Sequence, residues 1–182
     1  MNIQGLKHQL RLMANSPILN YATAGLTSQM IGGGKYGKVR MFTADRDTRE
    51  FITPHSHRYD FLCLVLEGEV VNTIYREEVW ATPESNKFVV SVIEPTDQFG
   101  KFWSRQLRTA SFTEDSSTYN AGDTYEMGHK QIHSIRFSKG SVVLFFEGPE
   151  LSTTSHILEP FSDGARVPTF NTPEWMFQEK AP

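Results

Sequence analysis

The chain has 182 residues, enough for one domain with a large buried core, and its 18 Lys and Arg against 21 Asp and Glu give a formal net charge of -3. Because the acidic and basic residues are interspersed, the sequence shows no basic surface that would bind nucleic acid. One cysteine cannot form an internal disulfide, the N-terminus lacks the apolar core of a signal peptide, and no stretch is long and apolar enough to span a membrane, so we expect a soluble, cytoplasmic protein.

Residues 1–34 are predicted to form a short helix followed by a connector. The apolar residues from Ile3 to Met13 recur at spacings of three and four, which predicts an amphipathic helix over residues 2–14 that packs on the outside of the main body. Residues 17–34 are small, polar and rich in glycine. We therefore expect a flexible, glycine-rich loop there.

Residues 35–160 carry the pattern of a β-barrel. Turn residues separate about ten short segments with strand character, and helical periodicity is missing. This pattern predicts an all-β fold, an antiparallel jelly-roll barrel. The predicted strands are Lys38–Ala44, Glu50–Thr53, Phe61–Leu66, Val70–Tyr75, Phe88–Ile93, Gln106–Thr113, Thr124–Met127, Ile132–Phe137, Val142–Glu147 and Ser155–Leu158.

Residues 161–182 are expected to form an extended C-terminal tail. The segment contains Pro168, Pro173 and Pro182 and shows no periodic pattern. Its aromatic and apolar residues could anchor it to the barrel or to the partner subunit of a homodimer. These anchors are Trp175, Met176 and Phe177.

The strongest functional signal is the pair of histidines in His55-Ser56-His57. Residues i and i+2 of an extended strand point to the same side, so both imidazoles can reach one point. Neutral imidazole is the commonest protein ligand of divalent transition metals, and the pair therefore predicts a metal site. A pair of exposed histidines at a strand end is the alternative interpretation.

His133 is the candidate for a third ligand. On an unbroken strand it shares one face with the apolar Ile135 and Phe137, whereas Ser134 and Arg136 share the other face. We therefore expect His133 to point into the core, where a histidine needs a hydrogen-bond partner or a metal.

Together these regions resemble the two sequence motifs of the cupin superfamily, over about residues 35–160. His55, His57 and Gly68 match the first motif, and His133 matches the single histidine of the second motif. The usual proline and glycine of the second motif are not in place. The resemblance implies a cupin-type barrel in which the three histidines bind a metal.

The chain departs from the first cupin motif at Phe61, where a glutamate usually stands. Without that carboxylate the implied site has three histidine ligands. The stretch that begins at His55 is also similar to that of uncharacterised cupins related to the cysteine-dioxygenase-like thiol oxygenases, which use a three-histidine site. This likeness implies a divalent transition metal, Fe(II) first and Zn or Mn otherwise, with open positions for substrate and dioxygen.

Asp60 is the nearest carboxylate that could replace the missing glutamate. Its parity along the strand is opposite to that of the two histidines before it, so we expect a structural role, either pairing with Arg58 or capping a turn. Glu126 and His129, which precede the third histidine, are weaker alternatives for a fourth ligand.

Inward positions on neighbouring strands supply the candidates for substrate contacts. Arg40 could bind the carboxylate of an amino-acid-like substrate through two hydrogen bonds, although an exposed strand charge is the alternative. Tyr125 is assigned with Arg40 to the catalytic group, and Tyr59 is a further candidate. Cys63 lies in an apolar run without a basic neighbour, so we expect it to behave as a small hydrophobic residue.

These predictions favour a metal-binding cupin that oxidises a small molecule and has neither a nucleic acid nor a membrane as partner. The same histidines could hold zinc or manganese and activate water, which would make the protein a hydrolase or a lyase. Two alternatives belong to other classes. One is a non-catalytic barrel that captures a small ligand, and the other is a structural module that presents surfaces for assembly.

Overall fold

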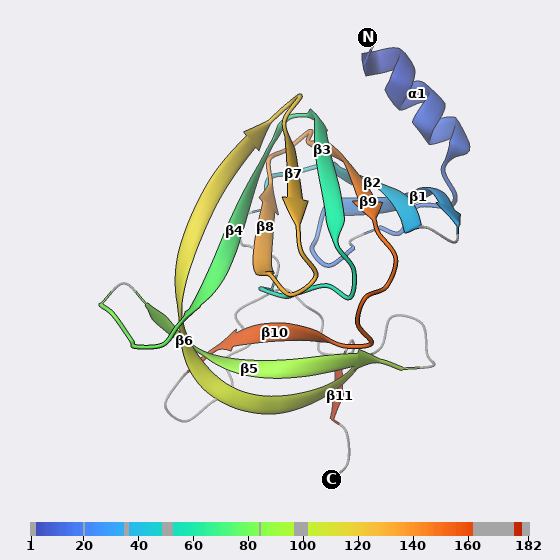
Figure 1. Ribbon diagram of the computed structural model, residues 1–182. Helices are drawn as coiled ribbons and strands as arrows, with labels where there is room; N and C mark the ends of the chain where they lie inside the picture. Colours follow the sequence, from blue (N-terminus) through green and yellow to red (C-terminus); the bar gives the residue numbers. More distant parts are fainter. Residues whose placement is uncertain are drawn as a thin grey trace.

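The computed structural model describes residues 3–19, 21–34, 37–48, 53–83, 85–96, 102–161 and 177–179 (Figure 1). Within these residues the elements are α1 (Ile3–Met13), β1 (Leu26–Gly34), β2 (Gly37–Ala44), β3 (Phe61–Glu67), β4 (Glu69–Glu78), β5 (Asn86–Pro95), β6 (Phe102–Asn120), β7 (Thr124–Met127), β8 (Ile132–Phe137), β9 (Val142–Glu147), β10 (Ser155–Pro160) and β11 (Phe177–Glu179).

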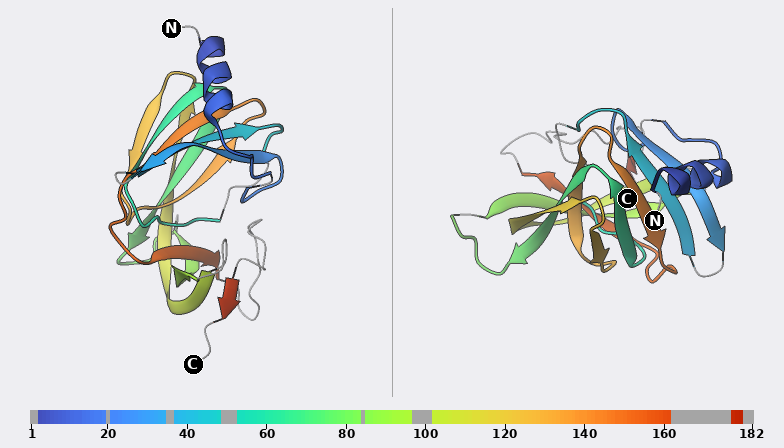
Figure 2. Two further views of the ribbon diagram at one scale, coloured as in Figure 1. Left: turned by 90° about the vertical axis from the view of Figure 1, so that its right-hand side faces the viewer. Right: turned by 90° about the horizontal axis from the view of Figure 1, so that it is seen from above.

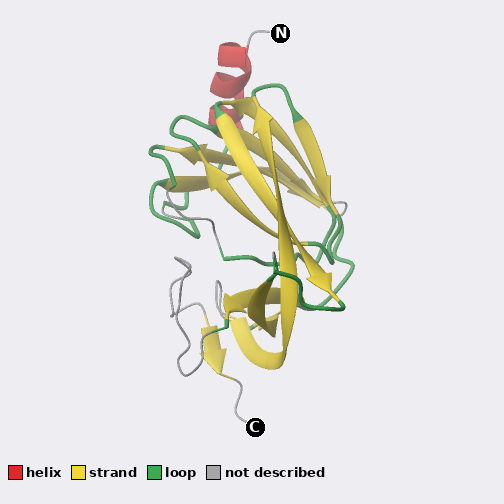
Figure 3. Ribbon diagram, turned by 90° about the vertical axis from the view of Figure 1, so that its left-hand side faces the viewer, coloured by secondary structure: helices red, strands yellow, loops and turns green. Residues whose placement is uncertain are grey.

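Two antiparallel sheets form the body of the protein. The first has the order β1-β2-β9-β3-β7, and the second has the order β10-β5-β6-β4-β8, with β11 added to β6 in parallel. The long strand β6 pairs with β5 through its first half and with β4 through its second half. It therefore curves between two parts of the molecule (Figure 1). We call the upper part, formed by the first sheet together with β4 and β8, the upper barrel, and the lower part, around β5 and β10, the lower sheet. Strands make up nearly all of the regular structure (Figure 3).

The upper barrel encloses the larger hydrophobic core. Its side chains alternate along the strands, as Phe61, Cys63 and Val65 do on β3, and they meet Phe137 of β8 and Phe145 of β9. The sequence therefore folds here as its period of two predicts. This confirms the prediction of an all-β, antiparallel barrel of the jelly-roll type.

The strand β4 separates the larger core from a smaller one. Val70 lies in the upper core, whereas Tyr75, which has the opposite parity, packs with Phe88, Phe112 and Leu158 in the lower sheet. Residues on both faces of β4 are therefore buried in its middle part, although Val71 near its start is only half-buried.

A short segment around His55 closes the second sheet. His55 N–H donates to the carbonyl oxygen of His133 on β8 at 2.8 Å, and His133 N–H donates back to His55 at 2.9 Å. On its other side the segment pairs with β10, because Leu158 N–H donates to Pro54 at 2.9 Å and Ser56 N–H donates to His156 at 2.8 Å. Since β8 and β10 are the two ends of the sheet order, these bonds complete a ring of strands.

The helix α1 packs on the outside of the first sheet, beside β1 and β2 (Figure 2). Its Leu6 and Leu10 contact a cluster that includes Met41 and Leu144. The predicted helix and its position are thereby confirmed. Within the described residues, the helical segment is too short and too polar to cross a membrane.

The flexible loop predicted for residues 17–34 is wrong for its second half, because Leu26–Gly34 forms the strand β1. This strand pairs with β2 along its whole length, with a register shift between Met30 and Gly32. Glycine is unfavourable in a strand, but β1 has backbone hydrogen bonds to β2 on one side and to Asn15, Ile18 and Tyr21 on the other. The sheet therefore begins before Lys35.

Most of the other predicted strands are confirmed to within a few residues. The exceptions are Gln106–Thr113, which is part of the longer β6, and Glu50–Thr53, of which the structure describes only Thr53, outside any strand. Of the predicted tail, Phe177–Glu179 is described as β11 beside β6. The anchors Trp175 and Met176 lie outside the described residues.

Gly68, in the turn between β3 and β4, offers a test of this packing. Its φ is 72°, and an added Cβ would lie 2.7 Å from Ser141 Oγ and 2.8 Å from Ser141 Cα. We expect Gly68→Ala to lower the free energy of unfolding by about 2–4 kcal/mol, through backbone strain and the clash together. Urea denaturation measures this change.

Gly122 is the matched control for this substitution. Its φ is 99°, but an added Cβ would meet nothing within 4 Å, so Gly122→Ala should lose only about 1–2 kcal/mol of strain energy. Equal losses in the two variants would contradict the close packing of the turn against Ser141.

Candidate metal centre

Three histidines converge where the segment around His55, which closes the second sheet, pairs with β8. His55 and His57 lie on that segment, and His133 is the second residue of β8. One ring nitrogen from each lies within 4.8 Å of the others. The ring centroids are 4.7 Å apart for His55 and His57, and 5.2 Å apart for each pair with His133. The structure therefore brings together the three residues that the sequence predicts as ligands.

The outer ring nitrogens of two of these histidines have carbonyl partners. His55 Nδ1 lies 2.7 Å from the Thr53 carbonyl oxygen, and His133 Nδ1 lies 2.6 Å from Asn72 Oδ1. Because a carbonyl oxygen only accepts, each Nδ1 carries the hydrogen and each Nε2 keeps a lone pair. His57 Nε2 lies 3.0 Å from His133 Nε2, so two ring nitrogens face each other at the centre of the cluster.

Burial keeps the three imidazoles neutral. Desolvation lowers the pKa of His55, and it lowers the pKa values of His57 and His133 well below the ordinary value, with the neighbouring histidines adding to the effect. A charge on one ring would disfavour a charge on the next. The cluster is therefore a set of neutral nitrogen donors near pH 7, the protonation state that a metal needs.

Aromatic rings form the surroundings of the cluster. The ring centroid of Phe61 is 4.6 Å from that of His57 and 5.4 Å from that of His133, and Tyr59 lies 5.4 Å from His57. Phe145 contacts both His57 and Phe61. Phe61 thus lies against the histidines where the cupin motif has its glutamate, and no carboxylate of the described residues joins the three-histidine group.

Arg40 lies on the inner side of β2 in an ion pair with Glu147. Arg40 Nε donates to Glu147 Oε1 at 2.6 Å, and the side chains are 20% and 5% exposed. Lys38 Nζ is 3.8 Å from the other carboxylate oxygen. Burial raises the pKa of the Tyr59 hydroxyl, and the negative charge of nearby Glu147 raises it further. The pair therefore lies close to the aromatic wall of the histidines.

Tyr125 lies on β7 and belongs to the larger hydrophobic core. Its ring contacts Phe61, with centroids 6.4 Å apart, and Tyr119, with centroids 4.6 Å apart. Its buried hydroxyl lies beside the Cys63 thiol without a well-formed hydrogen bond. Burial raises its pKa well above the ordinary value, so the phenol is neutral.

Cys63 is a buried, free cysteine in the upper core. Burial raises the pKa of its thiol to about 12, so the thiolate needed for nucleophilic chemistry is scarce at neutral pH. This agrees with the expectation of a small hydrophobic residue.

Asp60 caps a turn, which confirms one of its two predicted roles. The other predicted role, pairing with Arg58, is wrong. Asp60 Oδ1 accepts hydrogen bonds from His129 N–H at 2.7 Å and from His129 Nδ1 at 2.9 Å. Arg58 pairs instead with Glu150 at 3.1 Å. Glu126 is exposed on β7, and His129, held by Asp60, lies outside the three-histidine group.

Sequence reasoning missed Asn72 and Glu147. Asn72 is buried on the inner face of β4, and Glu147 is buried at the end of β9. Each is a polar residue at an inward position of an apolar, alternating strand, and that parity was the available signal. Their partners, however, come from distant strands that local pattern does not reveal.

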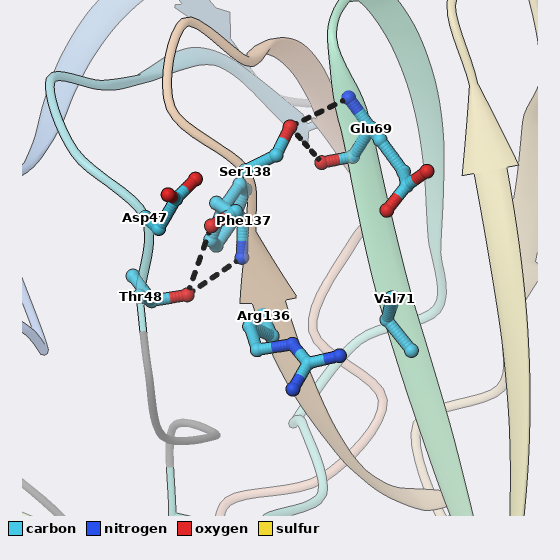
Figure 4. A pocket seen from close by; sticks show the side chains of 7 residues that line it. All are labelled: Asp47, Thr48, Glu69, Val71, Arg136, Phe137 and Ser138. Carbon is cyan, nitrogen blue, oxygen red and sulfur yellow. Dashed lines mark hydrogen bonds between the residues drawn. The ribbon is translucent and has the colours of Figure 1, made fainter.

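A separate surface pocket of about 270 Å³ lies between the loop after β2 and the strands β4 and β8 (Figure 4). Arg136 and Val71, which line it, have the opposite parity from His133 and Asn72 and lie on the other face of the sheet. Thr48 Oγ1 holds the pocket wall by accepting from Phe137 N–H at 2.8 Å (Figure 4). This pocket is therefore distinct from the histidine cluster.

No protein-family model matches the chain, and no curated protein matches its sequence. Similar solved structures include an RmlC-like cupin from Shewanella frigidimarina, with 15% identity, 75% of this chain and 94% of that chain covered, and a TM-score of 0.42. A cupin superfamily protein from Desulfitobacterium hafniense has 12% identity, 75% and 84% coverage and a TM-score of 0.40. Iron(II) HppE in complex with substrate has 9% identity, 73% and 54% coverage and a TM-score of 0.42. The first two of these proteins are cupins.

The lowered pKa values predict how the stability of the metal-free protein depends on pH. A histidine that is neutral when folded takes up a proton on unfolding below its ordinary pKa, so stability is complete above about pH 6.5 and decreases as the pH falls. Each such histidine contributes up to about 1.4 kcal/mol per pH unit. Denaturation at about pH 7.5 and about pH 5.5 should show this loss, and His57→Gln should reduce it.

His8 provides the control, because it is exposed on α1. The variant His8→Gln should keep the slope of stability against pH that the unchanged protein has. A slope that is the same in the His57→Gln protein would contradict the burial of a neutral imidazole at that position.

Proposed function

We propose that His55, His57 and His133 bind a divalent transition metal, Fe(II) in the first place, and that the protein acts on a small molecule as a cysteine-dioxygenase-like non-haem iron oxygenase. The convergence of three neutral imidazoles without a carboxylate carries this proposal. A cytoplasmic location and a homodimer stay predictions from the sequence.

The donor set fits such a metal. Imidazole nitrogens suit Fe, Zn and Mn, whereas Mg and Ca prefer oxygen ligands. His57 Nε2 and His133 Nε2 lie 3.0 Å apart, so both nitrogens would be near enough to be ligands of one ion. The hydrogen bonds at the outer nitrogens of His55 and His133 hold these rings in the tautomer that leaves Nε2 free.

The charge balance supports an anionic substrate. A divalent ion held by three neutral imidazoles keeps two positive charges, and an uncompensated charge in a buried site is costly. Since no carboxylate of the described residues joins the group, the proposed substrate is a small molecule with an anionic donor. When bound, Fe(II) would supply the redox chemistry toward dioxygen that the side chains lack.

Arg40 and Tyr125 have proposed roles in binding that substrate. Glu147 engages the Nε atom of Arg40, so we assign the terminal guanidinium nitrogens to a polar group of the substrate. The hydroxyl of Tyr125 is neutral and buried without a well-formed hydrogen bond, so we assign it as a hydrogen-bond donor inside the barrel. Phe61 and Phe145 would exclude water from the centre.

Metal content and oxygen uptake test this proposal. The purified protein is expected to hold about one divalent metal ion per chain, and His133→Ala or His57→Ala should lose most of it, because either change removes a ligand. The iron-loaded protein should consume oxygen in the presence of a small thiol. Arg40→Lys should keep the metal and the ion pair with Glu147 but reduce oxygen uptake, because it removes the forked donor.

The exposed His8 again gives the control, and His8→Ala should keep both the metal and the oxygen uptake. Stoichiometric zinc without oxygen uptake would support the water-activating alternative. A protein without bound metal, in which His133→Ala changes nothing measurable, would contradict the metal centre itself.

Phe61→Glu tests the importance of the missing carboxylate. The new side chain would start from a position whose ring is 4.6 Å from that of His57 and would add a charged ligand. We expect metal affinity to rise about tenfold or more, and added azide to increase the affinity less than in the unchanged protein, because the site would already hold an anion. Competition with a coloured chelator, with and without azide, measures both effects.

Phe61→Leu is the matched control, because it removes the ring without adding a ligand. Its metal affinity and its response to azide should stay close to those of the unchanged protein. If the glutamate and leucine variants behave alike, position 61 does not face the metal.

A further inference from the structure

We infer that Asn72 is the positioning residue that sets the tautomer of His133 and thereby prepares its Nε2 atom for the metal. This inference rests on the proposed function, since it assumes that His133 is a ligand. It concerns a residue on β4 that has no contact with His55 or His57 among the described hydrogen bonds.

The geometry of Asn72 suits this role. Its Oδ1 atom lies 2.6 Å from His133 Nδ1, and the residue is 2% exposed. Asn72 faces the barrel interior on β4, and β4 pairs directly with β8, which carries His133. Both backbones are therefore fixed by the same antiparallel ladder, so the two side chains meet without loss of loop entropy.

The other end of the Asn72 amide decides its orientation. Asn72 Nδ2 lies 3.6 Å from the sulfur of Met127, and a thioether sulfur can only accept a weak hydrogen bond. With the NH₂ group toward sulfur, the carbonyl oxygen must face His133. The flipped amide would turn two N–H groups toward Nδ1, which would then accept and leave the hydrogen on Nε2, where a metal cannot bind.

The orientation of the Asn72 amide also affects the tautomer of His57, through His133. With its hydrogen on Nδ1, His133 offers a lone pair at Nε2, and His57 Nε2, 3.0 Å away, donates to it. The metal-free protein should therefore contain His133 as the Nδ1–H tautomer and His57 as the Nε2–H tautomer, and a metal that binds His57 Nε2 would move this hydrogen to Nδ1. His55 receives its orientation from the Thr53 carbonyl instead, whereas Asn72 orients His133 and, through it, His57.

Nitrogen NMR of the metal-free protein, with labelled histidine, tests the inference directly. The unchanged protein should show the Nδ1–H tautomer at His133. Asn72→Asp should keep this tautomer, because a carboxylate also accepts, whereas Asn72→Leu should shift His133 toward Nε2–H. In chelator competition with Zn²⁺, Asn72→Leu is expected to lose about 10–100-fold in affinity, and Asn72→Asp should stay within a few-fold of the unchanged protein.

Thr73→Val is the matched control on the neighbouring position. Thr73 is as buried as Asn72, and its hydroxyl bonds Ser116 across the sheet, so the variant loses a partly buried hydrogen bond without touching His133. It should keep both the tautomer and the Zn²⁺ affinity.

Three outcomes would overturn the inference. The first is an Nε2–H tautomer at His133 in the unchanged protein, a measurement that does not depend on the folding of any variant. The second is a tautomer mixture in Asn72→Leu that equals that of the unchanged protein. The third is a loss of Zn²⁺ affinity in Thr73→Val that equals the loss in Asn72→Leu. If the unchanged protein does not bind Zn²⁺, the proposed metal centre fails, while the tautomer result still decides the role of Asn72. The two failures are thus distinguishable.

Discussion

Two backbone hydrogen bonds between His55 and His133 hold the candidate site together, because they join the segment with two of the ligands to the strand with the third. The same segment pairs with β10 on its other side and completes the ring of the second sheet. Ligand geometry is therefore determined by the backbone ladder and not by long, flexible side chains. A site built on paired strands is held more rigidly than a site on a free loop, even though its residues are far apart in sequence.

Electrostatics then determines what this rigid arrangement can do. Burial among Phe61, Phe145 and Tyr59 disfavours protonation of the histidines, so the cluster contributes no charge of its own. The nearby charged pair of Arg40 and Glu147 is compensated internally at 2.6 Å. A cation at the histidines would thus find no counter-charge in its immediate shell among the described residues. In the proposed function, the anion would come from the substrate, since Phe61 stands where the cupin motif has a glutamate.

The sequence predicts this site better than it predicts its support. Parity along a strand correctly turned His133 inward, and the spacing of His55 and His57 correctly placed both on one side, because a period of two is a local property. The prediction of a loop at the glycine-rich β1 failed because pairing with β2, which is not a local property, overrides the weak strand propensity of these residues. Contacts such as Asn72 with His133 join residues on different strands, and one sequence does not reveal such pairings.

The position of the ligands also links metal binding to the stability of the barrel. Because the three histidines lie on both sides of the junction that closes the second sheet, a metal held by all of them would favour the closed ring over an open one. Any ligand that binds only the folded state stabilises it by RT ln(1 + [L]/Kd), about 2.7 kcal/mol at a hundredfold excess over Kd. By the same linkage, whatever pre-arranges the closed ring raises the affinity for the metal. The hydrogen bonds at His55, the aromatic ring of Phe61 and the amide of Asn72 would therefore contribute to one equilibrium, because closing the ring of strands also brings the three histidines together.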